Sequence, residues 1–183
     1  MRTRWHDREV TFPEPGGEIH DVHPFADPEE ARNPVRRLRG RLPAAVTLWT
    51  APGPVGLTVA SAQIVDGDPG LAYGLIDPDS DLYEAITELG VFTVQLLAPR
   101  HRGLADRFGG LEPAPGGPFR GGEHWRDTTW GPVLRDIESW AGCHLVSTRE
   151  AGWSQLVEGR IEELEVGKDD PLVYYRGRYR ELS

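Results

Sequence analysis

Sulfur-containing residues and long apolar runs are scarce in this chain of 183 residues. It has one cysteine, Cys143, and one methionine, Met1. A single cysteine cannot form an internal disulfide. No apolar run approaches the ~20 residues that cross a bilayer, and the N-terminal Met-Arg-Thr-Arg-Trp-His is not a signal peptide. These absences predict a cytoplasmic protein that does not enter a membrane.

Basic residues are also in deficit. The chain has 20 Lys and Arg against 29 Asp and Glu, for a net charge of −9. Binding to a phosphate backbone requires a basic face, so nucleic acid is not an expected partner. The one basic cluster is Arg36-Arg37-Leu38-Arg39-Gly40-Arg41. It is either the solvated face of a short helix or the source of an arginine that reaches an anionic cofactor group.

The length predicts one domain. Residues 1–27 have no clean periodicity and are interpreted as an N-terminal arm, and residues 28–183 as the domain. Asp27-Pro28-Glu29-Glu30 is typical of a helix start, and residues 35–42 predict a second short helix. His20 and His23 have no further ligand at a suitable spacing, so no metal site is expected.

Strand and turn signals alternate between Leu42 and Leu97. Strands are predicted where β-branched and apolar residues alternate, over residues 43–50, 56–61, 70–76 and 91–97. Ala51-Pro52-Gly53-Pro54 predicts a turn. Asp79-Ser80-Asp81 opens a helix that ends at Gly90. The small, hydroxyl-rich strand at 56–61 would let a flat ligand lie against its backbone.

The second half continues in the same manner. A helix is predicted over residues 100–108, and glycine and proline fill a long loop over 109–118. That loop is long enough to be a functional cover. Further strands are predicted over 137–149, 154–166 and 172–179. The whole pattern predicts a mainly β, antiparallel fold with a few short helices.

Six pieces in this order resemble the flavin-reductase-like family of FMN-binding split barrels. They are the strand at 43–50, Gly56-x-Thr58-x-x-Ser61, the strand leading to Ser80, Gly90-Val-Phe92 with Gln95-Leu-Leu, Leu104-Ala-Asp-Arg-Phe108-Gly109, and Pro171-Leu-Val-Tyr-Tyr-Arg-Gly-Arg-Tyr179. The resemblance covers residues 35–182. It implies an antiparallel split β-barrel, FMN or FAD as cofactor, and NAD(P)H as hydride donor. It also implies a homodimer with the flavin at or near the subunit interface, serving a partner monooxygenase.

The resemblance also implies where the flavin binds. The residues equivalent to Leu57, Thr58, Val59, Ala60 and Ser61 line the flavin ring and ribityl chain in the family. The alternative is an ordinary strand of a barrel wall, in which Thr58 and Ser61 pack or form local hydrogen bonds.

At the end of the site that holds the flavin phosphate, the family places a Ser or Thr at a helix N-terminus beside a Lys or Arg. Here Ser80 matches, with Asp77 in the same turn, but Pro78 and Asp81 stand where positive charge is expected. Arg107, Arg100 and Arg37 are the candidates to compensate, and Phe108 follows Arg107 in a matching piece.

Two other interpretations apply to the same turn. The commonest meaning of its sequence is a helix N-cap. Asp77-x-Asp79-x-Asp81 also imitates a calcium loop, but Leu82 stands where that loop requires glycine.

The hydride-donor side departs most from the family. Gly152-Trp153-Ser154 occupies the place of a Gly-Asp-His triplet whose histidine helps to position the nicotinamide nucleotide. Trp153, Ser154 and Tyr175 would shape this side, and Tyr174 and Tyr179 would line it together with Tyr175. Trp153 could stack on a ring or occlude the donor position. Occlusion is favoured here. The Asp and His that hold the nucleotide in the family are missing, and the indole takes up the space that the nucleotide needs. Cys143-His144 are strand neighbours on opposite faces, so they do not form a catalytic pair.

Two hypotheses therefore stand. The first is an NAD(P)H:flavin oxidoreductase. The second is a barrel that binds flavin, deazaflavin or haem without NAD(P)H-dependent reductase activity.

Overall fold

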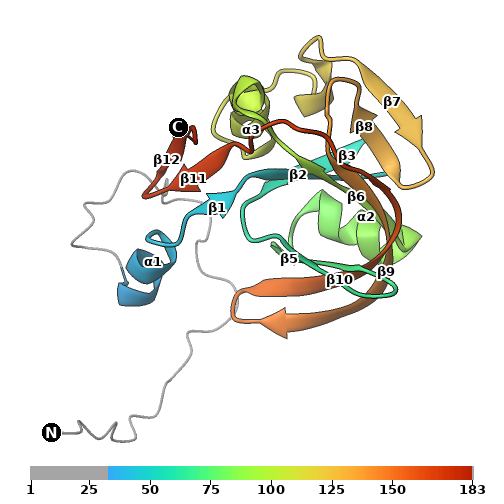
Figure 1. Cartoon of the computed structure of the whole chain (residues 1–183), viewed down its shortest axis with the longest axis horizontal. Coiled ribbons are helices and arrows are strands. Elements are labelled where there is room, and N and C mark those ends of the chain that lie inside the picture. The colour runs from blue at the N-terminus through green and yellow to red at the C-terminus, as the bar shows by residue number, and fades with distance from the viewer. Residues whose placement is uncertain (1–32, 183) are drawn as a thin grey trace, which may run out of the picture.

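The computed structural model describes residues 33–182, and Figure 1 shows a mainly β molecule with a few short helices. The arm predicted over residues 1–27, with His20 and His23, lies outside the described residues, as does the helix start at 27–30. The described residues contain no helix that is long and apolar enough to cross a membrane.

One antiparallel sheet forms the body of the protein, with the strand order β3-β2-β6-β9-β10-β5-β4. Its strands are β2 (Thr47–Ala51), β3 (Val55–Val59), β4 (Gln63–Val65), β5 (Leu71–Ile76), β6 (Val91–Leu96), β9 (Trp140–Ala151) and β10 (Ser154–Glu165). The consecutive strands β3 and β4 lie at opposite ends of this order, so the sheet must curl until its ends approach. Trp49 on β2 touches β5, because a Cβ added to Gly74 would lie 2.6 Å from the indole.

The inner face of the curled sheet holds the first core. The rings of Trp49 and Phe92 stack there with centroids 4.9 Å apart, and helix α2 (Asp81–Leu89) packs Leu82 and Ile86 against the same cluster. Burying side chains of this size stabilises the fold by about 1.5–3 kcal/mol each. The core thus fixes α2 beside the end of β3 (Figure 1).

The opposite face carries a second core. Helix α3 (Arg102–Phe108) follows a short 3-10 turn, Pro99–His101, and packs there with the hairpin of β7 (Trp125–Thr128) and β8 (Gly131–Leu134). The buried amide of Gln95 joins the sheet to this hairpin. Its Oε1 accepts a hydrogen bond from the Leu134 N–H at 2.8 Å. A second short 3-10 turn, Pro118–Arg120, lies in the loop that precedes the hairpin.

A separate three-stranded sheet completes the structure. It consists of β1 (Ala44–Ala45), β11 (Val173–Tyr175) and β12 (Arg178–Arg180), in the order β1-β11-β12. The exposed helix α1 (Pro34–Arg39) lies beside it, since the Arg176 N–H donates to the Gly40 carbonyl at 2.9 Å. The single closing strand predicted over 172–179 was wrong, because Arg176 and Gly177 both adopt positive φ and turn the chain back on itself.

The predicted fold class is confirmed at the level of a mainly β protein with few helices. Three strands were missed. β4 is only three residues long, and β7 and β8 follow a glycine-rich loop that masks their pattern. The described strands form no closed ladder, so the sheet order defines a curled sheet.

Candidate functional site

Strand β3 is the element around which the site is built. It stands first in the strand order, so one of its edges has no neighbouring strand among the described residues. Its side chains alternate between the two cores: Val59 is buried with the first, while Gly56 lies against the ring of Phe108 in the second. A pocket flanks β3 on each side.

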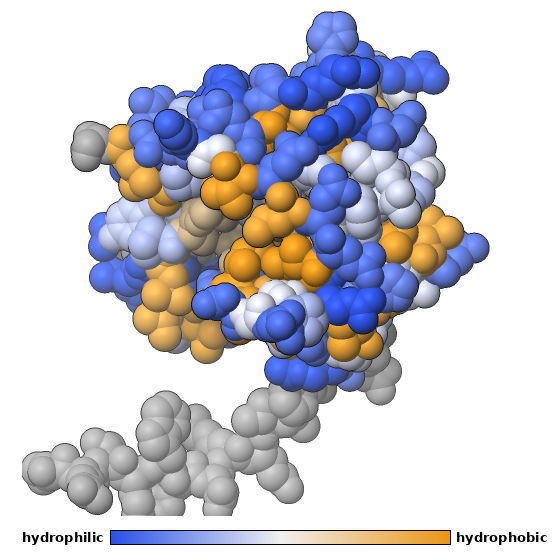
Figure 2. Space-filling model, turned by 45° about the vertical axis from the view of Figure 1, so that its right-hand side comes forward, coloured by the Kyte–Doolittle hydropathy of each residue, from blue (hydrophilic) through white to orange (hydrophobic). Residues whose placement is uncertain are grey.

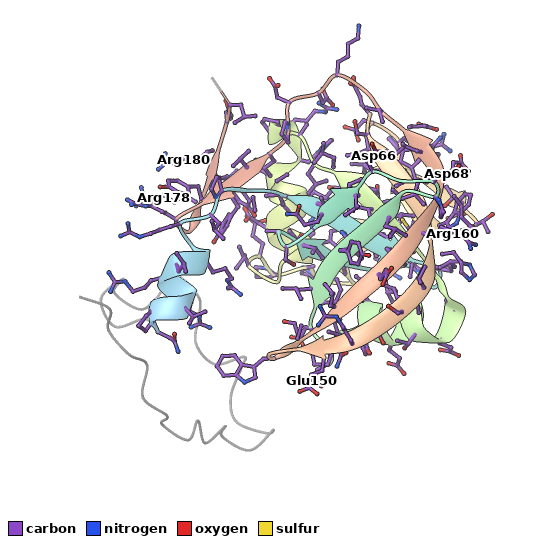
Figure 3. The ribbon with its side chains drawn as sticks, turned by 60° about the horizontal axis from the view of Figure 1, so that its bottom comes forward. Asp66, Asp68, Glu150, Arg160, Arg178 and Arg180 are labelled. Carbon is purple, nitrogen blue, oxygen red and sulfur yellow. The ribbon has the colours of Figure 1, made fainter. Side chains whose placement is uncertain are left out.

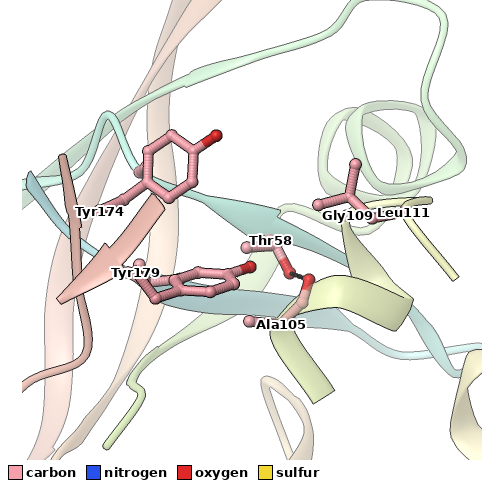
Figure 4. A pocket seen from close by; sticks show the side chains of 8 residues that line it. Thr58, Ala105, Gly109, Leu111, Tyr174 and Tyr179 are labelled. Carbon is pink, nitrogen blue, oxygen red and sulfur yellow. Dashed lines mark hydrogen bonds between the residues drawn. The ribbon is translucent and has the colours of Figure 1, made fainter. Parts of the chain in front are cut away.

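The first pocket, termed the tyrosine pocket, has a volume of about 140 Å³. It is lined by Val46, Thr58, Ala60, Ala105, Gly109, Leu111, Tyr174 and Tyr179 (Figure 4). The Thr58 hydroxyl donates to the Ala105 carbonyl at 2.8 Å, which fixes β3 against α3. A cavity of roughly 150 Å³ admits one six-membered ring. The pocket therefore suits a flat ring held between apolar and aromatic walls.

Tyr179 is held in place by its neighbours. Its hydroxyl donates to the Asp106 carboxylate at 2.8 Å, and its ring meets that of Tyr174 edge to face at 5.5 Å. Burial and the hydrogen bond to Asp106 raise the pKa of Tyr179. The phenol thus stays protonated at neutral pH and its ring is a fixed wall.

The second pocket, termed the aspartate pocket, has a volume of about 340 Å³. It lies between the 54–57 segment and the start of α2, and is lined by Pro54, Val55, Gly56, Leu57, Asp79, Ser80, Asp81, Leu82 and Pro118. Ser80 is the N-cap of α2, as one interpretation predicted: its hydroxyl accepts from the Tyr83 N–H at 3.2 Å and donates to the Asp77 carbonyl at 2.7 Å. The Asp77 carboxylate accepts from the Asp79 N–H at 2.9 Å. Ser80 is thus already engaged, and carboxylates surround it.

None of the three candidate arginines forms an ion pair with the carboxylates of Asp77, Asp79 or Asp81. Arg107 forms a two-pronged ion pair with Glu123, and that pair holds the pKa of Glu123 below its usual range. Arg100 pairs with Asp169 and Asp136. Arg37 lies on α1, at the other end of the molecule from α2 (Figure 1). The residues present here do not fit a phosphate group well.

Ser61 has a role that its sequence did not reveal. Its hydroxyl donates to the Leu75 carbonyl at 3.1 Å and accepts from the Leu75 N–H at 3.2 Å. Because Ser61 follows β3 and Leu75 belongs to β5, this side chain links the two ends of the curled sheet. Ser61 thus lies just after β3, the strand that both pockets flank.

Trp153 and Ser154 lie at the tip of the β9–β10 hairpin. The pairing of Ala151 with Ser154 leaves Gly152 and Trp153 as a two-residue turn, with Gly152 at φ 66°, as type II′ turns require. Trp153 is 71% exposed and lines neither pocket. Within this chain Trp153 therefore occludes neither pocket.

The structure thus gathers part of the predicted set. Thr58 and Ala60 line the tyrosine pocket, and Leu57 and Ser80 line the aspartate pocket. Phe108 and Val59 are buried beneath them. Asp77 lies in the turn before α2, and Tyr175 lies on β11, where Arg176 covers its ring. Ala105 on α3, its C-cap Gly109 and the following Leu111 were missed, and the apolar spacing of residues 104–108 could have indicated Ala105.

Comparisons with known proteins agree with this architecture. The family described as "Flavin reductase like domain" matches residues 39–183. The chain belongs to this family. A relative from Variovorax paradoxus (strain S110), named FMN reductase (NADH) RutF, is 29% identical over 90% of this chain and 93% of its own. A flavin reductase from Pseudomonas putida is 30% identical over 79% of this chain and 86% of its own.

Solved structures of the family have the same fold. Component B of a nitrilotriacetate monooxygenase from Mycobacterium thermoresistibile has a TM-score of 0.73 and 29% identity, over 81% of this chain and 85% of that one. BorF, the flavin reductase component of a bacterial two-component tryptophan halogenase, has a TM-score of 0.70 and 27% identity, over 81% of this chain and 98% of that one.

Proposed function

We propose that this protein is a flavin reductase that transfers a hydride from NAD(P)H to FMN or FAD. The observation that carries the proposal is the edge of β3, which has no neighbouring strand among residues 33–182, with a ring-sized tyrosine pocket beside Thr58 of β3 and the following Ala60. Relatives at 29–30% identity that are named FMN reductase (NADH) and flavin reductase support it.

The chain contributes positioning and the exclusion of water. The flavin, when bound, supplies the hydride acceptor, and the protein must hold two rings face to face. In the proposed arrangement the backbone of β3 from Leu57 to Val59, continued by Ala60 and Ser61, bonds the rim of one ring. Tyr174 and Tyr179 bound the neighbouring space from the other side. No side chain needs to act as an acid or base.

The protein is proposed to act as a homodimer in the cytoplasm. Apolar side chains remain exposed on the part of the sheet that runs in the order β9-β10-β5-β4, namely Val65 on β4, Leu75 on β5 and Val146 on β9. In Figure 2 apolar side chains gather in the middle of one face, with hydrophilic side chains around them. Exposed apolar patches mark interaction surfaces, and a second copy would cover Val65, Leu75 and Val146. Trp153, exposed on the hairpin tip, would then contact the partner or its ligand.

An external electron acceptor completes the proposal. A relative from Rhodococcus jostii (strain RHA1), 30% identical over 79% of this chain and 74% of its own, is named HsaB, the reductase subunit of a flavin-dependent monooxygenase. By analogy, the reduced flavin made here would serve a partner monooxygenase.

One observation favours the second candidate, a flavin-binding protein without reductase activity. Trp153 and Ser154 occupy the hairpin tip where the family carries Asp and His. Stopped-flow mixing of the flavin-loaded protein with NADH and with NADPH distinguishes the two functions. Bleaching of the flavin absorbance by either nucleotide supports the reductase, and a flavin that binds but stays oxidised supports the second candidate.

A further inference from the structure

Positive charge is concentrated at one end of an otherwise acidic molecule. Within residues 34–45 and 173–182 the basic side chains are Arg36, Arg37, Arg39, Arg41, Arg176, Arg178 and Arg180, and the only carboxylate there is Glu181. Figure 3 shows Arg178 and Arg180 at this end, with Asp66 and Asp68 at the far end. β11 and β12, which carry Tyr174 and Tyr179, belong to the basic end, so the tyrosine pocket opens beside it.

Arg102 extends this basic end to the wall of the tyrosine pocket. It is exposed, and its guanidinium carbon lies 5.4 Å from the centre of the Tyr179 ring. Asp106, one turn further along α3, is hydrogen-bonded to Tyr179 instead. No ion pair joins Arg102 to a carboxylate of residues 33–182. A guanidinium that is fixed over an aromatic ring with its N–H groups open to solvent is well suited to bind phosphate.

The aspartate pocket offers the opposite environment. Asp79 and Asp81 line it, and the Ser80 hydroxyl has both of its hydrogen bonds within the protein. Two unit charges 6 Å apart interact by about 3 kcal/mol at an effective dielectric of 20, so these carboxylates repel a phosphate. An anionic ligand of β3 is therefore driven towards the tyrosine pocket.

We propose that Arg102 binds a phosphate of the ligand whose aromatic ring occupies the tyrosine pocket. The shared chemistry is one flat ring, either the nicotinamide of NAD(P)H or the ring at one edge of the FMN ring system, in a ligand whose ribosyl or ribityl chain carries a phosphate. This inference rests on the proposed flavin reduction and adds to it the residue that recognises the phosphate.

The test compares each phosphate-bearing ligand with a phosphate-free counterpart. Dissociation constants are measured by fluorescence titration for FMN and riboflavin, and for NADH and 1-benzyl-1,4-dihydronicotinamide. The proteins are the wild type, Arg102→Gln, Arg102→Lys and the control Arg149→Gln, which removes an exposed arginine on β9.

Arg102→Gln is expected to weaken one phosphate-bearing ligand by about 3- to 10-fold and to leave its phosphate-free counterpart unchanged. Arg102→Lys should restore part of that loss, and raising the salt concentration should reduce the difference. A loss confined to FMN places the flavin in the tyrosine pocket, and a loss confined to NADH places the nicotinamide there.

Two results overturn the inference: unchanged affinity for both phosphate-bearing ligands, or an equal loss for both members of a pair, since the latter shows that Arg102 acts through the packing of Tyr179. A wild-type protein that binds neither riboflavin nor FMN contradicts the proposed function itself, and the inference with it.

Discussion

Two tryptophans show that the surroundings of a side chain decide how much it contributes to the stability of the fold. Trp49 is fully buried, stacked on Phe92 and pressed against Gly74. Trp153 projects from a hairpin tip. The same side chain therefore stabilises the fold at one position and is available to a ligand or a partner at the other.

The Trp49→Ala substitution is expected to lower the free energy of unfolding by about 3–5 kcal/mol, because it leaves a cavity in the first core. Trp153→Ala should change it by less than about 0.5 kcal/mol. Urea denaturation followed by far-UV circular dichroism measures both. A large loss of stability in Trp153→Ala would show that this indole is packed in solution.

Ser61 offers a second prediction at this scale. Ser61→Ala removes both hydrogen bonds to Leu75 and should cost about 0.5–1.5 kcal/mol of unfolding free energy. The control Ser147→Ala loses one exposed hydrogen bond to Glu158 and should cost less. Denaturation curves measure the loss of unfolding free energy in both variants. Equal losses would mean that the hydrogen bonds of Ser61 stabilise the fold no more than the exposed hydrogen bond of Ser147 does.

Sequence reasoning at the residue scale succeeded where a local pattern carried the information. The Ser80 cap follows from Asp-x-Ser-Asp before an amphipathic helix, and the structure confirms it. The partners of Ser61 and Arg107 did not follow, because Leu75 and Glu123 lie 14 and 16 residues away along the chain. Contacts of this kind depend on how the elements pack.

At the scale of elements, the ion pair between Arg107 and Glu123 fixes the glycine-rich loop after α3. Arg107 also lies 3.5 Å from the carbonyl of Pro118, which lines the aspartate pocket. The pair therefore positions one wall of that pocket.

The lowered pKa of Glu123 gives this pair a definite pH dependence. Its stabilisation is fully present above the ordinary glutamate pKa of 4.5 and is lost as the pH falls through the lowered pKa. The stability difference between the wild type and Glu123→Gln should thus be constant near neutral pH and shrink below about pH 4.5. Denaturation at several pH values tests this, with Glu163→Gln, an exposed carboxylate on β10, as the control. A difference that grows on acidification would contradict the assignment.

Helices and strands were predicted best where apolar residues recur with a clear helical or strand period. α2 and the strands β5, β6 and β10 lie within a residue or two of the predicted bounds. The hairpin of β7 and β8 was missed because the preceding glycine-rich loop masks its pattern, and its contacts with Gln95 and the second core do not follow from the local sequence.

At the scale of the whole molecule, the exposed apolar side chains on β4, β5 and β9 predict self-association. Light scattering at micromolar concentration should give about twice the 20.3 kDa mass of one chain. Leu75→Glu with Val146→Glu should shift the protein towards the monomer, because charges would be buried at the interface. Leu89→Glu on α2 is the matched control. A wild-type mass near that of one chain would contradict the proposed dimer.

The measurement that tests the central claim most directly is anaerobic reduction of bound flavin. The purified protein is loaded with FMN, freed of excess flavin, and mixed with NADH or NADPH in a stopped-flow instrument. The flavin absorbance band is expected to decay in a phase whose rate depends on nucleotide concentration. A protein that retains no flavin, or one whose bound flavin stays oxidised with both nucleotides, would contradict the proposed flavin reduction.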